Sequence, residues 1–181
     1  MENWARVTWT EASHILQLMG SKQAGLAETG MPSAYFDSLV EQNHLQDAAM
    51  FVGHALPRYE CIVWATRVLM EAEAVERRGP MMIAVLRWID DPNDANRRAA
   101  WDLAESEADD TPEKFLATAV FLSGGSISTP ELPPVLPPQE VCARLATAGV
   151  LTAAFSTENP DQFFRNAASL GTKIASKGLD G

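Results

Sequence analysis

The sequence predicts an all-α protein, a single domain (1–181) of about eight or nine helices whose helical hairpins are separated by a proline-rich strap. Residues that begin and end helices recur along the whole chain. Apolar residues repeat at the three- and four-residue spacing of an amphipathic helix, and no run alternates apolar and polar residues as a strand does. With 181 residues, 46% of them hydrophobic, the chain is long enough to bury a core without disulfides or metals.

The first predicted helix follows an expected frayed segment, residues 1–7. Thr8 and Glu11 have the capping-box spacing, in which a hydroxyl and a carboxylate each accept a hydrogen bond from the other residue's backbone N–H. We therefore expect a helix from Thr8 to about Met19. Residues 25–30 are then predicted to form a loop.

Four further helices fill the middle of the chain, and proline stands at the start of several of them because the first helical turn does not use its missing N–H. Their predicted ranges are Pro32–Gln42, His44–Leu56, Pro57 to about Val75, and Met81–Ile89. The last of these is apolar nearly all round. We expect it to be the most buried helix of the first helical block, residues 8–123.

The remaining helices also have legible boundaries. Their predicted ranges are Asn93 to about Ala108, Thr111 to the Gly124-Gly125 pair, Gln139–Phe155 and Pro160–Lys177, the last with Asn159 as its N-cap and Gly178 at its end. The final two should form a C-terminal hairpin, residues 139–178. Small residues at Ala146, Gly149 and Gly171 would let them approach closely.

The strap, residues 124–138, contains five of the eleven prolines, all between Pro130 and Pro138. Prolines three residues apart favour a polyproline II conformation, so the strap is a candidate ligand for an aromatic groove. It is equally a candidate connector. We favour the connector, with Leu132, Val135 and Leu136 packed on the protein's own helices, because those side chains would otherwise be exposed.

The net charge of −10 is concentrated in one stretch. Between Asp90 and Asp110, eight acids stand against Arg97 and Arg98. An acidic protein repels phosphate groups, so nucleic acids and anionic membranes are poor partners. The stretch is interpreted first as a solvated helix face and second as a docking surface for a basic partner.

The two cysteines, Cys61 and Cys142, lie in apolar helical patterns and are interpreted as buried free thiols of a reducing compartment. No secretory signal or membrane span is recognisable, so we expect a cytoplasmic protein without membrane insertion. Metal-ligand spacings, nucleotide-binding loops and the nucleophile elbow are all missing from the sequence. We therefore predict no cofactor and no catalytic residue.

One cluster keeps an enzyme hypothesis open. A pocket that gathered His54, Arg58, Glu60 and Trp64 would be the sign of a small hydrolase with an unrecognised helical site. Separately, Cys61 beside Glu60 and Arg58 is a candidate activated thiolate. Its apolar neighbours favour a buried, inert thiol instead.

Two stretches carry a resemblance to a known family. Residues 54–65 read His-Ala-Leu-Pro-Arg-Tyr-Glu-Cys-Ile-Val-Trp-Ala, and residues 121–134 read Phe-Leu-Ser-Gly-Gly-Ser-Ile-Ser-Thr-Pro-Glu-Leu-Pro-Pro. They resemble the two signature stretches of an uncharacterised bacterial family often encoded near type VI secretion clusters. The chain departs from that pattern at Tyr59, where arginine is usual, at Val63, which replaces one tryptophan of a pair, and at Cys61, which replaces a small residue.

The resemblance implies a cytoplasmic accessory protein of a secretion apparatus, and it transfers no catalytic residue. We therefore expect a non-enzymatic interaction module: an accessory protein, adaptor or effector chaperone whose partner is a secretion component or an effector. Its candidate contact residues are Asp102, Glu105 and Glu107 in the acidic stretch, and Leu132, Pro134 and Leu136 in the strap. An immunity-type inhibitor that binds a toxin through acidic residues is the alternative, beside the small enzyme. The sequence leaves the oligomeric state open.

Overall fold

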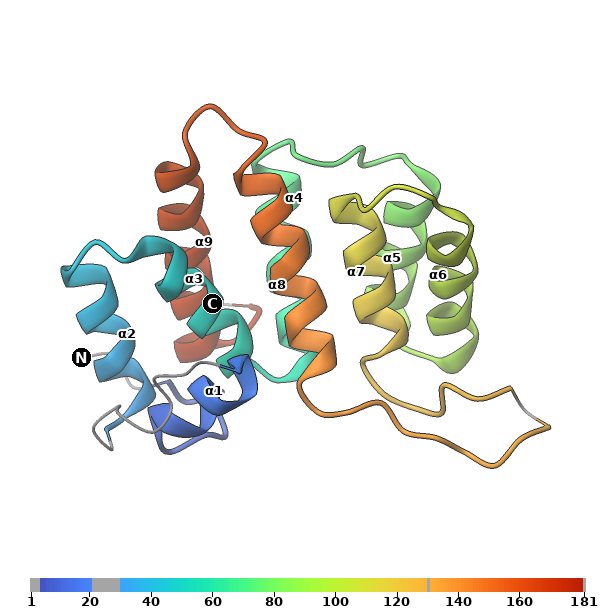
Figure 1. Cartoon of the computed structure of the whole chain (residues 1–181), viewed down its shortest axis with the longest axis horizontal. Helices are drawn as coiled ribbons and strands as arrows, with labels where there is room; N and C mark the ends of the chain where they lie inside the picture. Colours follow the sequence, from blue (N-terminus) through green and yellow to red (C-terminus); the bar gives the residue numbers. More distant parts are fainter. Residues whose placement is uncertain (1–3, 21–29, 130, 181) are drawn as a thin grey trace.

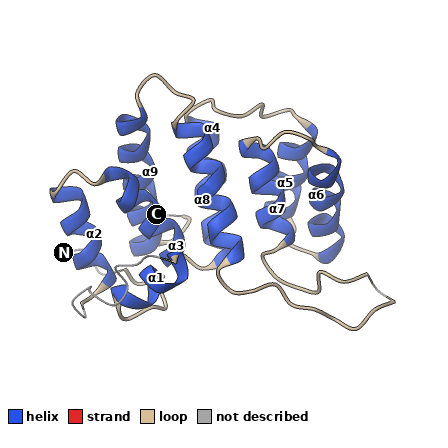
Figure 2. Cartoon of the chain, in the orientation of Figure 1, coloured by secondary structure: helices blue, strands red, loops and turns tan. Residues whose placement is uncertain are grey.

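A computed structural model describes residues 4–20, 30–129 and 131–180, and in these ranges the protein is all-α (Figures 1 and 2). Nine helices occur there and no strand, which confirms the predicted fold class. The helices are α1 (Ala12–Met19), α2 (Pro32–Glu41), α3 (Leu45–Ala55), α4 (Arg58–Glu71), α5 (Pro80–Asp90), α6 (Asp94–Ser106), α7 (Pro112–Phe121), α8 (Val141–Ala154) and α9 (Pro160–Lys177). The loop expected at residues 25–30 lies, except for Gly30, outside the described residues.

The helices form a continuous row across Figure 1. At one end, α1, α2 and α3 pack together, with α9 against α3; α4 and α8 lie in the middle; and α5, α6 and α7 form the other end. Within the described part of the chain, no helix is both long and apolar enough to cross a membrane.

The core is densest around α3 and α4. Every residue of α3 from Ala48 to Ala55 is buried, whereas α5 leaves Ile83 exposed. The expectation that α5 is the most buried helix of its block is therefore wrong. α5 packs mainly against α6 and α7, whereas α3 packs against α1, α2, α4, α8 and α9.

Trp64 of α4 fills the centre of the core, and the space that its ring needs accounts for glycine at two positions. Its side chain is fully buried, and its indole Nε1 donates a hydrogen bond to the carbonyl oxygen of Ala167 in α9 (2.9 Å). A Cβ at Gly53 would lie 2.7 Å from the indole ring, and one at Gly171 would overlap Val52. These glycines let α3, α4 and α9 pack close enough to enclose the ring.

The predicted C-terminal hairpin does not form a close helix pair. α8 packs mainly on α7, and α9 packs mainly on α3. The small residues serve other contacts, since Gly149 faces the backbone of Pro112 and Gly171 faces Val52 and Trp64. Small residues permitted a close approach, as expected, but the sequence did not reveal which helix would use it.

The start of the chain also differs from the prediction. The first helix begins at Ala12 rather than Thr8, with Glu11 as its N-cap and no side-chain capping bond. Residues 1–3 of the expected frayed segment lie outside the described residues, and residues 4–7 are docked rather than frayed. Trp4 is buried beside Phe36 and donates from its indole to Thr172 Oγ1 (3.0 Å), and the Arg6 N–H donates to the Ala175 carbonyl oxygen (2.9 Å).

Three predicted helix starts are confirmed by side-chain caps. Asn93, Thr111 and Asn159 each accept a hydrogen bond from the backbone N–H three residues later, at 2.8, 3.2 and 3.1 Å. The end of α9 at Gly178 is confirmed as well, with φ of 87°. α4 is shorter than expected, since it ends at Glu71 rather than near Val75.

Candidate interaction site

The strap projects from the body at the α5–α7 end, as Figure 1 shows, and the described residues from Glu131 to Leu136 are all exposed. Leu132, Val135 and Leu136 are 62%, 52% and 72% exposed. The interpretation that these side chains pack on the protein's own helices is therefore wrong. Pro134 is exposed with them, Pro137 is buried where the strap returns, and Pro130 lies outside the described residues.

Backbone contacts join the two limbs of the strap. The N–H of Ile127 donates to the carbonyl oxygen of Val135 (2.8 Å), and Ser126 Oγ accepts from the N–H groups of Ser128 (3.1 Å) and Val135 (3.2 Å). The strap is therefore a loop closed near its base. A connector that took the direct path between α7 and α8 would not need these bonds.

Arg97 of α6 fixes the outgoing limb. Only 4% exposed, it donates to the carbonyl oxygens of Phe121 (2.5 Å) and Ser126 (2.8 Å), and its guanidinium lies 4.8 Å from the centre of the Phe121 ring. Gly125 makes room for it: its φ is +68°, and a Cβ there would lie 3.2 Å from the guanidinium. Gly125 thus serves the arginine contact, not the predicted helix cap, which falls at Leu122.

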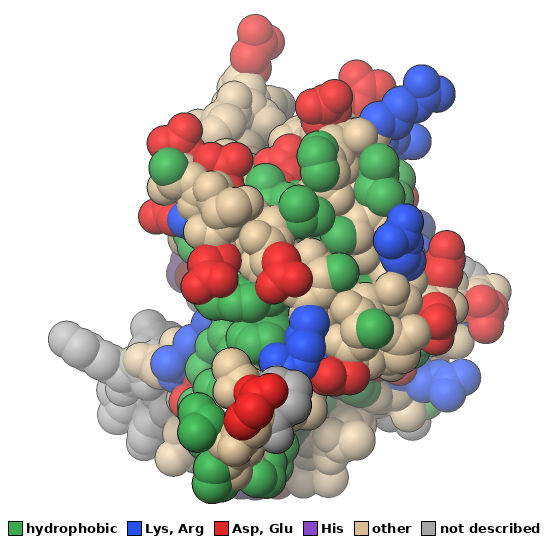
Figure 3. Space-filling view, turned by 90° about the vertical axis from the view of Figure 1, so that its right-hand side faces the viewer, with side chains coloured by type: hydrophobic (Ala, Val, Ile, Leu, Met, Phe, Trp, Pro, Cys, Tyr) green, Lys and Arg blue, Asp and Glu red, His purple; other side chains and the backbone are tan. Residues whose placement is uncertain are grey.

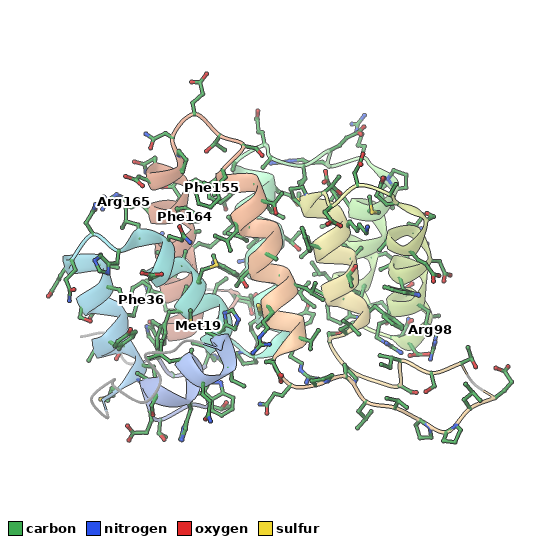
Figure 4. All side chains as sticks on the ribbon, viewed as in Figure 1. Met19, Phe36, Arg98, Phe155, Phe164 and Arg165 are labelled. Carbon is green, nitrogen blue, oxygen red and sulfur yellow. The ribbon has the colours of Figure 1, made fainter. Side chains whose placement is uncertain are left out.

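Arg98 adds a second attachment. It donates to the carbonyl oxygens of Ser126 and Ser128, both at 3.0 Å, and it lies at the base of the strap in Figure 4. Asp94 pairs with both arginines, at 2.5 Å from Arg97 and 2.9 Å from Arg98. Hydrogen bonds from Arg97 and then Arg98 hold the pKa of this carboxyl below its ordinary value.

Arg58, at the start of α4, joins the two ends of the strap. It donates to the carbonyl oxygens of Ser123 (3.0 Å), the residue before the strap, and Pro138 (3.3 Å), the last residue of the strap. We call Arg58, Arg97 and Arg98 the arginine clamp. Through Arg58, the two stretches that carry the family resemblance, residues 54–65 and 121–134, contact each other.

The acidic residues lie apart from the strap. Asp102 and Glu105 are exposed toward the end of α6, and Glu107 follows the helix, whereas Asp94 contacts the clamp at its start. Figure 3 faces this end of the molecule and shows acidic, basic and hydrophobic side chains interleaved over the surface, with the strap below. The structure therefore does not join the two groups of predicted contact residues into one surface.

The pocket expected of an enzyme is only half assembled. A cleft of about 460 Å³ is lined by His54 and Arg58 but not by Glu60 or Trp64. Cys61 is fully buried, and burial raises the pKa of its thiol. Burial likewise raises the pKa of Cys142 to about 12, so both thiols are inert at neutral pH. Within the described ranges, no group of three potential metal ligands is found.

Sequence reasoning missed the arginine clamp. Arg97 and Arg98 are the only basic residues in the acidic stretch. From the sequence, only their charge was considered, and their hydrogen bonds to carbonyl groups were not predicted. Their position five and six residues after Pro92, inside a helix rich in acids, was the available signal. Nothing in the sequence indicated that their partners would be Ser126 and Ser128.

Comparison with known proteins identifies one family. A family model described as a family of unknown function (DUF6931) matches residues 35–175, from α2 to α9. No curated protein and no solved structure matches the chain.

Proposed function

We propose that this chain, which belongs to the family of unknown function DUF6931, is a non-enzymatic protein-interaction module that presents its strap to a partner protein. The observation that carries the proposal is the exposure of Leu132, Val135 and Leu136 on a loop whose base is fixed. Leaving apolar side chains in water gains no folding free energy. A partner that buries them would supply that gain.

The partner's binding surface follows from the chemistry of the strap. Residues 133–138 read Pro-Pro-Val-Leu-Pro-Pro and take no helical or strand structure. Such segments dock in grooves lined by aromatic side chains, with the apolar residues between the prolines as anchors. The clamp lowers the conformational entropy lost on binding, because it holds the base of the loop before the partner arrives.

The resemblance to proteins encoded near type VI secretion clusters supplies a candidate context. In it, the module is a cytoplasmic accessory protein, adaptor or effector chaperone, and the groove belongs to a secretion component or an effector.

One observation favours the immunity-type alternative. Glu105 lies in the last turn of α6, which carries no basic residue, and Glu107 directly follows the helix. Acids at that end oppose the helix dipole by about 0.3–1 kcal/mol each, an unfavourable arrangement that a basic partner would relieve. Charge reversal at Asp102, Glu105 and Glu107 would then slow association and weaken its salt dependence.

The test of the proposal compares two double variants of the full chain. Leu132→Ser with Leu136→Ser changes the strap, and Ile83→Ser with Phe155→Ser changes two exposed apolar residues on the body. Partners captured from native cells are identified by mass spectrometry, purified and titrated against each variant. We expect binding to weaken at least about tenfold for the strap variant, roughly 1.4 kcal/mol, and to stay unchanged for the body variant.

A peptide of residues 124–138 should compete with the full chain for the same partner. If the strap variant binds as tightly as the unmodified protein, the proposal is wrong. Loss of binding in the acidic charge reversal alone would support the immunity-type alternative instead.

A further inference from the structure

The strap contains a short tandem repeat. Residues 131–134 read Glu-Leu-Pro-Pro, and residues 135–138 read Val-Leu-Pro-Pro. We call these segments the first and the second repeat. Leu132 and Leu136 stand in the same local sequence, so both repeats offer a partner the same apolar anchor followed by the same two prolines. The repeats differ only in their opening residue, which is an acid in the first and a valine in the second.

The structure attaches the second repeat to the rest of the protein. The carbonyl oxygen of Val135 accepts a hydrogen bond from the N–H of Ile127 (2.8 Å), and the N–H of Val135 donates to Ser126 Oγ (3.2 Å). Pro137 is buried where the strap returns to the body. A groove that enclosed the whole second repeat would have to break these contacts.

The first repeat is accessible along its whole length. Its four residues are all exposed. Among the described residues, its one backbone hydrogen bond runs from the N–H of Leu132 to the carbonyl oxygen of Thr129 (3.1 Å), within the strap itself. A groove can therefore enclose the first repeat while the base of the strap keeps its contacts with the arginine clamp.

Glu131 is the only charged residue of the strap, residues 124–138. Its side chain is exposed, and within the described ranges it has no ion pair or hydrogen bond. Two repeats with the same leucine and prolines give a groove no reason to prefer one of them. A charge at the start of one repeat does, because charged groups at an interface fix register and steer association. The net charge of −10 also attracts a basic surface.

We propose that the partner's groove encloses the first repeat and carries a lysine or arginine that pairs with Glu131. Leu132 fills the aromatic-lined part of the groove, and Leu136 contacts its edge. This inference rests on the proposed interaction function and specifies the chemistry of the partner. The groove is both aromatic and basic, whereas a groove selected by the second repeat would have an apolar site for Val135.

Two substitutions at position 131 of the full chain test the charge. Glu131→Gln removes the charge and keeps the size of the side chain, and Glu131→Lys reverses the charge. Glu158→Gln is the matched control, because it removes one charge from an exposed loop residue between α8 and α9. The partner protein captured with the unmodified chain is purified, and its association rate and Kd for each variant are measured at low and at high salt.

At low salt we expect Glu131→Gln to slow association and to weaken binding about fivefold. Glu131→Lys should weaken binding at least about thirtyfold, because two positive charges then face each other. High salt should reduce both effects, since it screens exposed charges. Glu158→Gln should bind within about twofold of the unmodified chain.

A swapped variant tests the register. Glu131→Val with Val135→Glu keeps the composition and the net charge of the strap and moves the acid into the second repeat. We expect it to bind as weakly as Glu131→Gln, because the second repeat stays attached to Ile127 and Ser126. Full affinity in the swapped variant would show that an acid anywhere on the strap is sufficient, and the proposed register would be wrong.

The proposal is also overturned if Glu131→Gln and Glu131→Lys bind as tightly as the unmodified chain, or if Glu131→Lys binds more tightly. In these cases, weaker binding of the Leu132→Ser, Leu136→Ser variant would leave the proposed interaction function standing. If that variant also binds normally, or if no partner is captured, both proposals are wrong.

Discussion

The helical body and the strap use the same kind of residue in opposite ways. Leu69 of α4 is fully buried, whereas Leu136 of the strap is exposed. The body is held together by apolar packing around α3 and α4, and the strap is held by guanidinium groups that bind its main-chain carbonyl oxygens. An element fixed through its backbone leaves its side chains free for a partner, which apolar packing would not allow.

The largest expected effect comes from making one substitution in both regions. Leu69→Ala should lower the free energy of unfolding by about 2–5 kcal/mol, because it leaves a cavity in the core. Leu136→Ala should change it by less than about 0.5 kcal/mol. Urea denaturation followed by circular dichroism measures both, and similar losses in the two variants would break the comparison.

Arg97 tests whether the strap is held by its backbone. Arg97→Lys should lower the free energy of unfolding by about 1–3 kcal/mol, since a compact ammonium cannot reach all the positions of Phe121, Ser126 and Asp94 that separate guanidinium nitrogens bind. Backbone hydrogen exchange at Ile127 and Ser128 should become faster in the same variant. Arg98→Lys is the matched control, because Arg98 is more exposed and its replacement should lower the free energy of unfolding by less. If hydrogen exchange in the strap is unchanged in the Arg97 variant, the clamp does not hold the loop.

Two side-chain contacts to backbone N–H groups sharpen the difference between the regions. Asn159→Ala removes the N-cap of α9 and should lower the free energy of unfolding by about 1 kcal/mol. Ser126→Ala removes the acceptor of two strap N–H groups and should leave global stability within about 0.5 kcal/mol. Its effect should appear in exchange at Ser128 and Val135, and a global loss as large as that of Asn159→Ala would count against a strap that is independent of the core.

The smallest expected effect is on stability at low pH, through the carboxylate of Asp94. Because the pKa of Asp94 is lowered in the folded protein, its ion pairs stabilise the fold above the unfolded pKa, about 3.9, and this contribution is lost as pH falls through the lower folded pKa. Asp94→Asn should therefore be less stable by no more than about 1 kcal/mol at pH 7, since the carboxylate is exposed. The difference between the two proteins should begin to shrink as the pH falls below about 4 and should vanish only below the folded pKa of Asp94. A difference in melting temperature that persists at the lowest pH would show that the carboxylate's charge is not the cause.

Local signals predicted most of the fold. Asn93, Thr111 and Asn159 act within their own helical turns, so the sequence alone located those helix starts. The partners of helices are set by contacts between distant residues, and for that reason the positions of Gly149 and Gly171 were misassigned. Thr8 failed as a cap because Trp4 docks on α9 and fixes the path of the chain that leads into α1.

The candidate site was predictable only in part. The proline spacing located the strap, but the general tendency of apolar residues to be buried gave the wrong environment for Leu132 and Leu136. The sequence contains no signal for the clamp's targets, because they are main-chain carbonyl groups. His54 and Arg58 were considered together and do line one cleft, but Trp64, which was grouped with them, is enclosed in the core between α3 and α9.

Photo-crosslinking in cells tests the central claim most directly. A crosslinking amino acid replaces Leu136 in one protein and Phe155, the exposed aromatic residue after α8, in another. The account predicts that position 136 crosslinks to one defined partner protein and that position 155 does not. Crosslinks from position 136 only to the chain's own helices, or partner crosslinks only from position 155, would contradict it.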